Sequence, residues 1–142
     1  MKARELMTSN NLECVTQEDS LQRAAQIMRD SNIGSVPVVE DEKSMRLVGI
    51  ITDRDITIRH VAENPKADCT VGDHMSKGRI HTASPDDEAE DVMRTMKAEQ
   101  VRRVPVCEGD RLVGIIAQAD VATQTGDRKT GDVVEKISES SR

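Results

Sequence analysis

The sequence predicts an α+β fold in which two βαββα repeats pack against each other with pseudo-twofold symmetry. Two internal matches lead to this prediction. Residues 35–40 (SVPVVE) recur as residues 103–108 (RVPVCE), and residues 46–51 (RLVGII) recur as residues 111–116. Self-similarity of this kind indicates a repeat architecture. The offset shortens between the two motifs within a polar stretch, where a hairpin loop tolerates a change of length.

Each repeat contains one strongly amphipathic stretch that predicts a helix. Apolar residues recur at the spacing i, i+3, i+4, i+7, which places them on one helix face. They are Leu21, Ala24, Ala25 and Met28 in the first copy, and Ala89, Val92, Met93 and Met96 in the second. We interpret the methionines as core residues. Residues 16–19 and 84–87 supply a hydroxyl as N-cap, followed by carboxylates, and should start the helices.

Short β-branched runs after each helix predict a hairpin. The remaining elements are a short strand before each amphipathic helix and a second helix after each hairpin. The predicted strands are 12–15, 36–39 and 47–51, then 80–83, 104–107 and 112–116; the second helices start at Thr52 and near Gln118. Pro37 and Pro105 cannot donate to a ladder, so each should lie near a strand start or at an edge.

The repeats divide the chain into three segments. The first repeat, with the N-terminal segment and a linker, is expected over residues 1–66, and the second over residues 67–124. Residues 125–142 form a tail in which apolar positions at 130–137 predict a short docked helix.

Composition excludes several classes of function. The chain has no Phe, Tyr or Trp and a formal charge of −6, which disfavours base stacking and binding to a phosphate backbone. No apolar run approaches the length of a membrane span. We therefore expect no nucleic acid and no membrane as partners, and a cytoplasmic location.

The six cysteine and histidine residues show no close metal-binding spacing. They are Cys14, Cys69, Cys107, His60, His74 and His81. An odd number of cysteines without a CxxC pair predicts free thiols in a reducing compartment. We expect no dedicated metal site and interpret the histidines as surface loop residues.

An apolar helix, then a hydrophobic-Pro-hydrophobic run, then LVGIITDRD at residues 47–55 resembles the CBS (cystathionine-β-synthase) domain. The tandem resembles a stand-alone CBS pair, or Bateman module, from about residue 5 to residue 121. The resemblance implies a three-stranded sheet with two helices per repeat and a disc-like homodimer of pairs. It also implies clefts between repeats that hold AMP, ADP, ATP or S-adenosylmethionine.

The ribose motif of the family is matched by residues 49–55, with Thr52 and Asp55 at its polar positions. A carboxylate can accept hydrogen bonds from two ribose hydroxyls. The same two residues also form a capping box, which needs no ligand. The second copy, residues 114–120, keeps Asp120 but has Ala117 in place of the hydroxyl, so we expect two unequal clefts.

Basic residues precede only the second hydrophobic-Pro-hydrophobic run. Arg102 and Arg103 replace Gly34 and Ser35, and guanidinium groups bind phosphate well. Pairing with Glu99 or Asp110 is the alternative, and neighbouring strand residues face opposite ways. The full candidate ligand-binding set is Thr52, Asp55, Asp120, Arg102, Arg103, Val36, Pro37, Val104, Pro105 and Thr16.

These features favour a binding module over an enzyme. The sequence shows no catalytic constellation and no Gly-rich phosphate loop. We expect an adenine nucleotide or S-adenosylmethionine to bind as ligand, with no cofactor required. Any output would pass through an unidentified effector protein. Two alternatives remain open: a stress-associated dimeric interaction protein without a nucleotide, and a metal-binding protein.

Overall fold

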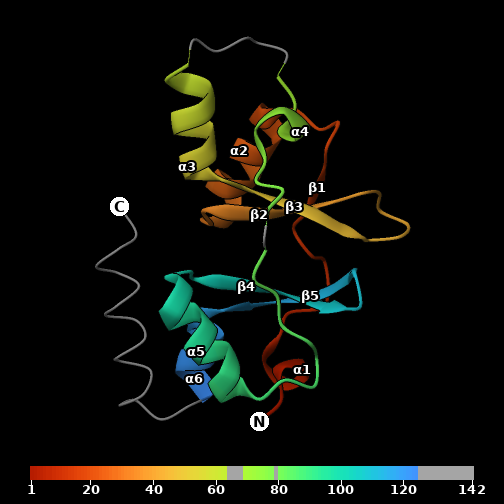
Figure 1. Cartoon of the computed structure of the whole chain (residues 1–142), viewed down its shortest axis with the longest axis vertical. Coiled ribbons are helices and arrows are strands. Elements are labelled where there is room, and N and C mark those ends of the chain that lie inside the picture. The colour runs from red at the N-terminus through yellow and green to blue at the C-terminus, as the bar shows by residue number, and fades with distance from the viewer. Residues whose placement is uncertain (64–68, 79, 125–142) are drawn as a thin grey trace. The chain divides into compact units, whose positions relative to one another are not determined.

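The computed structural model describes residues 1–63, 69–78 and 80–124, which form two compact units (Figure 1). One unit is Glu13–Ile80, and the other combines Met1–Leu12 with the chain from His81 onward. The short helix expected at 130–137 lies outside the described residues.

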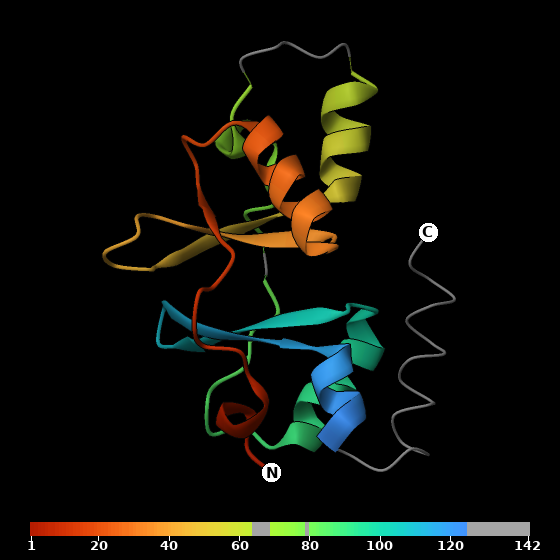
Figure 2. The same cartoon turned by 180° about the vertical axis from the view of Figure 1, so that it is seen from behind.

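The unit Glu13–Ile80 contains one complete repeat. Its elements are β1 (Val15–Thr16), α2 (Leu21–Ser31), β2 (Ser35–Val39), β3 (Leu47–Thr52), α3 (Asp53–Asp55), η1 (Ile56–Val61) and α4 (Val71–His74). The strand order is β1-β2-β3, with β1 parallel and β3 antiparallel to β2. The helices α2 and α3 lie on the same face of this sheet (Figures 1 and 2).

The other unit repeats this arrangement with a weaker first strand. Its elements are α1 (Ala3–Leu6), α5 (Ala89–Glu99), β4 (Arg103–Glu108), β5 (Arg111–Ala117) and α6 (Gln118–Gln124). The strands β4 and β5 are antiparallel, and the strand expected at 80–83 is reduced to a single parallel bridge between Ala83 and Val106. Gly109, at a φ of 63°, provides the tight turn of this shorter hairpin.

The predicted α+β class with two repeats is confirmed, whereas the three-stranded sheet expected in each repeat is found only in the unit Glu13–Ile80, because the described part of the other unit has the two-stranded sheet β4-β5. Pro37 lies in β2 opposite Ile50 of β3. On the other side of β2, pairing with β1 begins only at Val38, so no described strand is paired with Pro37 there. A missing backbone donor is tolerated at such a position, because no ladder bond is lost there.

The predicted helix starts are wrong by several residues. The N-cap of α2 is Ser20, whose hydroxyl accepts a hydrogen bond from the Arg23 N–H, and the N-cap of α5 is Glu88. At residue 16 the backbone N–H instead donates to Asp19 Oδ2 (2.8 Å), and Ser84 N–H donates to Asp87 Oδ2 in the same way. Each carboxylate closes a turn before the helix begins.

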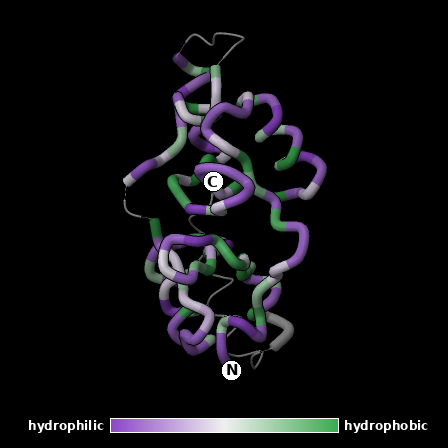
Figure 3. Tube along the Cα trace, turned by 90° about the vertical axis from the view of Figure 1, so that its right-hand side faces the viewer, coloured by the Kyte–Doolittle hydropathy of each residue, from purple (hydrophilic) through white to green (hydrophobic). Residues whose placement is uncertain are grey.

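Each unit has its own hydrophobic core, and Figure 3 shows how apolar and hydrophilic residues alternate along the chain. One core consists of Val15, Leu21, Ala24, Met28, Val36, Val38, Ile51, Val71 and Met75. The other consists of Ala3, Leu6, Ala83, Ala89, Val92, Met93, Met96, Val104, Val106, Ile116 and Val121. The methionines of both predicted helix faces are core residues, as expected. Ala25 is exposed, and Ile27 packs against the core instead.

Short helices exchange partners between the two repeats. The segment with α1, which precedes the first repeat in sequence, packs against α5, α6 and β5 of the second. The segment with α4, which precedes the second repeat, packs in the unit of the first. Thr8 bridges to Ile115, and Ser76 bridges to Ile50. Each unit is therefore completed by a segment that the sequence order assigns to the other repeat.

Two further expectations concern membranes and thiols. Among the described helices, none combines the length and the apolar character needed to cross a bilayer. All three cysteines are free of disulfide bonds, with Cys107 buried and the other two half-buried.

Candidate functional site

The turn from β3 into α3 holds the first pair of candidate residues. Thr52 is the N-cap of α3, and its hydroxyl accepts a hydrogen bond from the Asp55 N–H (3.0 Å). In return, the Thr52 N–H donates to Asp55 Oδ2 (3.0 Å). The capping box expected from the sequence is therefore present.

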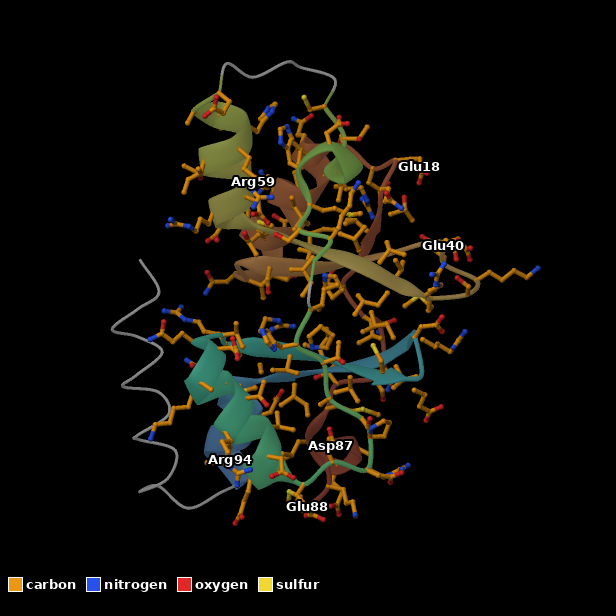
Figure 4. The ribbon with its side chains drawn as sticks, viewed as in Figure 1. Glu18, Glu40, Arg59, Asp87, Glu88 and Arg94 are labelled. Atoms are coloured by element: carbon orange, nitrogen blue, oxygen red, sulfur yellow. The ribbon has the colours of Figure 1, made fainter. Side chains whose placement is uncertain are left out.

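Asp55 has a second oxygen with a weaker partner. Asp55 is the one charged residue that is buried in the described part of the chain, at 8% exposure. Its Oδ1 lies 3.7 Å from Arg59 Nε, on the helix that follows (Figure 4). That distance exceeds a normal hydrogen bond, so this is an ion pair without direct donation.

The turn from β5 into α6 keeps half of the same cap. The Ala117 N–H donates to Asp120 Oδ2 (2.9 Å). This bond needs only the backbone of residue 117, so the carboxylate retains a structural partner although the hydroxyl is lost. The capping interpretation therefore explains Asp120 as well as Asp55, although residue 117 has no hydroxyl.

The structure brings the candidate arginines next to the second turn. The Arg102 carbonyl accepts a hydrogen bond from the Gln118 N–H (2.8 Å), and Arg103 pairs with Ala117 in the β4–β5 ladder. In the first repeat the Gly34 carbonyl accepts from the Asp53 N–H (2.9 Å). Residues that are 14 or more positions apart in the sequence thus meet at one end of each hairpin.

The difference between the two turns has a steric side. A Cβ atom at Gly34 would lie 3.1 Å from the Asp53 carboxylate, so the first repeat has room for a carboxylate but little for a side chain at position 34. The second repeat has Arg102 and Gln118 at the matching positions. The matching positions thus carry Gly34 and an acidic residue in the first repeat, but a basic residue and a neutral amide in the second.

Gln118 was missed by the sequence analysis. Its Oε1 is buried and has no hydrogen-bond partner among the described residues. Such an acceptor is rare in folded proteins and needs an explanation, such as a bound molecule. Its position directly after the β5 strand was the only sequence signal that could have singled it out.

The remaining candidate residues separate into different environments. Val36 and Val104 are core residues of their units, whereas Pro37 and Pro105 are buried outside those clusters. Thr16 pairs with Val39, at the opposite end of β2 from the Ser35–Thr52 pair. Within its own unit, Thr16 is therefore not brought together with Thr52.

A hollow of about 590 Å³ lies beside Thr16, at the hairpin end of its unit. Its lining carries five carboxylates: Glu18, Asp19, Glu40, Asp41 and Glu42. Arg23 and Lys43 are the basic residues of the lining, and Figure 4 shows Glu18 and Glu40 at this end of the unit. The excess of negative charge makes this hollow unsuitable for a phosphate group.

Pairing with Glu99 was one alternative role for Arg102 and Arg103. In the structure the Glu99 carboxylate contacts a histidine. Glu99 Oε2 lies 3.1 Å from His81 Nε2. Two other histidines also have a close neighbour, which the sequence spacing did not predict. His60 and His74 contact each other edge to face, with Cys69 beside them.

Comparison with known proteins identifies the repeats. The CBS-domain family model matches residues 3–60 and 71–124. The chain belongs to the CBS-domain family. Hypoxic response protein 1 of Mycobacterium tuberculosis is 35% identical over 120 residues, covering 84% of this chain and 82% of that protein. The CBS domain-containing protein YhcV of Bacillus subtilis is 34% identical over 125 residues, or 87% and 86% of the two chains.

Solved structures of CBS pairs have the same fold. Hypoxic response protein I, crystallised with two coordinated zinc ions, superposes with a TM-score of 0.77 at 35% identity, covering 89% of this chain and all of that one. The CBS pair of protein MJ0100, in complex with 5′-methylthioadenosine and S-adenosyl-L-methionine, superposes with a TM-score of 0.73 at 29% identity. The match covers 90% of this chain and 98% of that one. This chain is thus a CBS-domain pair, a regulatory type of module, and some similar pairs bind adenosine ligands.

Proposed function

We propose that this CBS pair is a regulatory module that binds an adenosine ligand at its strand-to-helix turns. Asp55 and Asp120 accept hydrogen bonds from ribose hydroxyls, and Arg102 or Arg103 binds phosphate when the ligand carries it. The observation that carries the proposal is the meeting of Arg102 with the Gln118–Asp120 turn through a 2.8 Å backbone hydrogen bond. A guanidinium and a carboxylate at one turn match the phosphate and the ribose of a nucleotide.

Three further observations support this function. Gln118 Oε1 is a buried acceptor without a partner among the described residues, and it is suited to an N–H or O–H donor of a ligand. Asp55 uses one oxygen for its cap, while the other has, among the described residues, only a distant ion pair, so capping does not prevent a ligand contact. The MJ0100 pair, which is bound to two adenosine compounds, supports the same ligand class.

The ligand acts by shifting an equilibrium between arrangements of the module. It can do so only by binding one arrangement more tightly than another. We expect a homodimer of pairs, as the family resemblance implies, and an effector protein that reads the arrangement. Light scattering after gel filtration, with and without ligand, measures the dimer directly.

Calorimetric titration tests the proposed function. AMP, ATP, S-adenosylmethionine and 5′-methylthioadenosine are titrated into the full chain and into the variants Asp55→Asn and Asp120→Asn. At least one variant should bind the ligand at least about 10-fold more weakly than the parent chain does, since a hydrogen bond to a charged group is worth roughly 1.5 to 3 kcal/mol. Asp87→Asn is a matched control, because Asp87 accepts the same type of backbone bond from Ser84.

A second pair of variants separates the two roles. Arg102→Gln and Arg103→Gln should weaken the binding of AMP and ATP but leave the binding of 5′-methylthioadenosine unchanged, because that compound has no phosphate. No heat with any of the four compounds at millimolar concentration would refute the proposed function. Equal binding by all variants would refute the assigned residues.

A further inference from the structure

Three side chains with metal-binding groups converge in the unit Glu13–Ile80. The ligand atoms of His60, Cys69 and His74 all lie within 4.8 Å of one another, and all three residues are half-buried. The imidazole rings of His60 and His74 have centroids 5.2 Å apart at an interplanar angle of 64°. Two imidazoles and one thiol at this separation form a compact donor set.

The chain positions these groups from two separate elements. His60 lies in the last turn of η1, and His74 is the final residue of α4. Cys69 directly precedes the Thr70 cap of α4. His60 and Cys69 are nine positions apart in the sequence, and the fold brings their ligand atoms together.

Backbone hydrogen bonds fix the Cys69 end of the cluster. The Cys69 carbonyl accepts from the Leu21 N–H (3.3 Å), and the Val71 N–H donates to the Asp19 carbonyl (2.8 Å). Thr70 N–H donates to Asp73 Oδ2 (2.9 Å) and caps α4. These bonds hold the thiol and the imidazole of His74 on a short, anchored segment.

The His60 end rests on an unusual helix. The stretch Ile56–Val61 is a π-helix, in which the Ala62 N–H donates to the Thr57 carbonyl (3.0 Å). Such turns are rare and occur frequently at functional sites. Here the wider turn brings His60 to the side of α4, where η1 and α4 are in contact.

We propose that His60, Cys69 and His74 bind one zinc-class divalent cation through two imidazole nitrogens and a thiolate. Tetrahedral zinc with these ligands places donor atoms roughly 3.3 to 3.6 Å apart, so small side-chain rotations within the observed cluster complete the site. Imidazole and thiolate together select zinc over calcium or magnesium. The fourth position is taken by water or by another ligand.

Binding has a chemical and a structural consequence. The Cys69 thiol loses its proton to solvent as the metal–sulfur bond forms, while the imidazoles bind in their neutral form. The metal links η1 to α4, so it stabilises the unit Glu13–Ile80. Because η1 begins directly after Asp55, the metal also restrains the helix that follows the proposed ribose contact. The site itself rests on the side chains of this unit and is independent of the adenosine proposal.

Metal titration of the full chain, without a histidine tag, tests the site. Zinc affinity and stoichiometry are measured by competition with a chelator, and Co²⁺ is used as a spectroscopic probe. We expect one zinc per chain, and a sulfur-to-cobalt charge-transfer band in the near ultraviolet. Cys69→Ser should abolish that band. Cys69→Ser, His60→Ala and His74→Ala should each lower the affinity for zinc by at least about 100-fold. Even the loss of a residue that only hydrogen-bonds to a metal ligand lowers metal affinity roughly 10- to 100-fold.

Matched controls lie elsewhere in the chain. Cys14→Ser removes the other half-buried thiol, and His81→Gln removes the histidine that contacts Glu99; both should bind zinc like the parent chain. Far-UV circular dichroism without metal shows whether each variant is folded. If one of the three variants of the metal-binding residues fails to fold, the other two and the cobalt band of the parent chain still show whether the site binds metal. A Kd weaker than about 100 μM, or a cobalt band that survives Cys69→Ser, would overturn the proposal.

Discussion

Substituting Gly49 or Gly114 by alanine tests the exchange of segments between the repeats. A Cβ atom at Gly114 would lie 2.6 Å from Met7 Sδ and 2.9 Å from its Cγ. A Cβ atom at Gly49 would lie 2.8 Å from Met75 Sδ and 2.9 Å from the Ser76 carbonyl oxygen. These contacts are far inside van der Waals distance, so the Met7 side chain must move in one variant and the Met75–Ser76 segment in the other.

The two substitutions should differ in cost. Overpacking costs about 1 to 3 kcal/mol, and alanine regains roughly 0.5 to 1 kcal/mol over glycine within a strand. At Gly114 the obstacle is a flexible thioether, which gives a net loss of about 1 kcal/mol. At Gly49 the obstacle includes the backbone of Ser76, which pairs with Ile50 through bonds of 2.9 and 3.1 Å. We therefore expect a loss of about 2 kcal/mol there.

Urea denaturation followed by far-UV circular dichroism measures the free energies of unfolding, because the chain has no Trp or Tyr for fluorescence. Gly78→Ala is the control, since no atom lies within 4 Å of its Cβ position, and it should change stability by less than about 0.5 kcal/mol. Met7→Ala should relieve most of the cost at Gly114 in a double-mutant cycle. If Gly114→Ala is as stable as the parent chain, or if Met7→Ala gives no relief, the packing of Met7 on β5 is refuted.

Three further predictions concern caps, thiols and surface charge. Thr52→Ala removes the hydroxyl of the α3 cap and should lower the free energy of unfolding by about 0.5 to 2 kcal/mol in urea denaturation; an unchanged midpoint would contradict it. Burial raises the pKa of Cys107 to about 11, so its thiolate fraction at pH 8 is about 0.1%. Mass spectrometry during iodoacetamide treatment should find Cys107 alkylated last, and early labelling there would contradict its burial. The Arg4 guanidinium lowers the pKa of Asp86, so this pair stabilises the fold above the ordinary Asp pKa and stops doing so as pH falls through the lowered value. The difference in stability between the parent chain and Asp86→Asn should therefore shrink in acid and in high salt; a difference independent of pH would exclude the pairing.

The periodic features of the fold could be predicted from the sequence. The amphipathic spacing that ends at Met28 and Met96 identified both long helices, because burial of one face imposes that period. The repeated hairpins followed from β-branched runs on either side of polar loops. These signals are local, and each occurs twice, so one copy supports the interpretation of the other.

Features that depend on distant parts of the chain could not be predicted in this way. Carboxylates at Asp19 and Asp87 close turns that resemble helix starts in sequence, which displaced the predicted N-caps. The exchange of α1 and α4 depends on which repeat each short segment packs against, and sequence order does not specify that. His60 and Cys69 come together only in the folded chain, and their spacing in the sequence resembles no metal motif.

The candidate nucleotide site was partly accessible from sequence. The family motif located Thr52, Asp55 and Asp120, and the structure explains all three as caps as well. The meeting of Arg102 with the second turn, and the unpartnered oxygen of Gln118, required the fold.

The central claim is that the carboxylate turns of this CBS pair hold an adenosine ligand. Native mass spectrometry of the chain with AMP, ATP, S-adenosylmethionine and 5′-methylthioadenosine tests it most directly. The account predicts a bound adenosine compound that is lost, or strongly reduced, when Asp55 and Asp120 are both replaced by Asn, and that is retained in Asp87→Asn. Absence of any bound compound in the parent chain, or equal binding by the double variant, would contradict it.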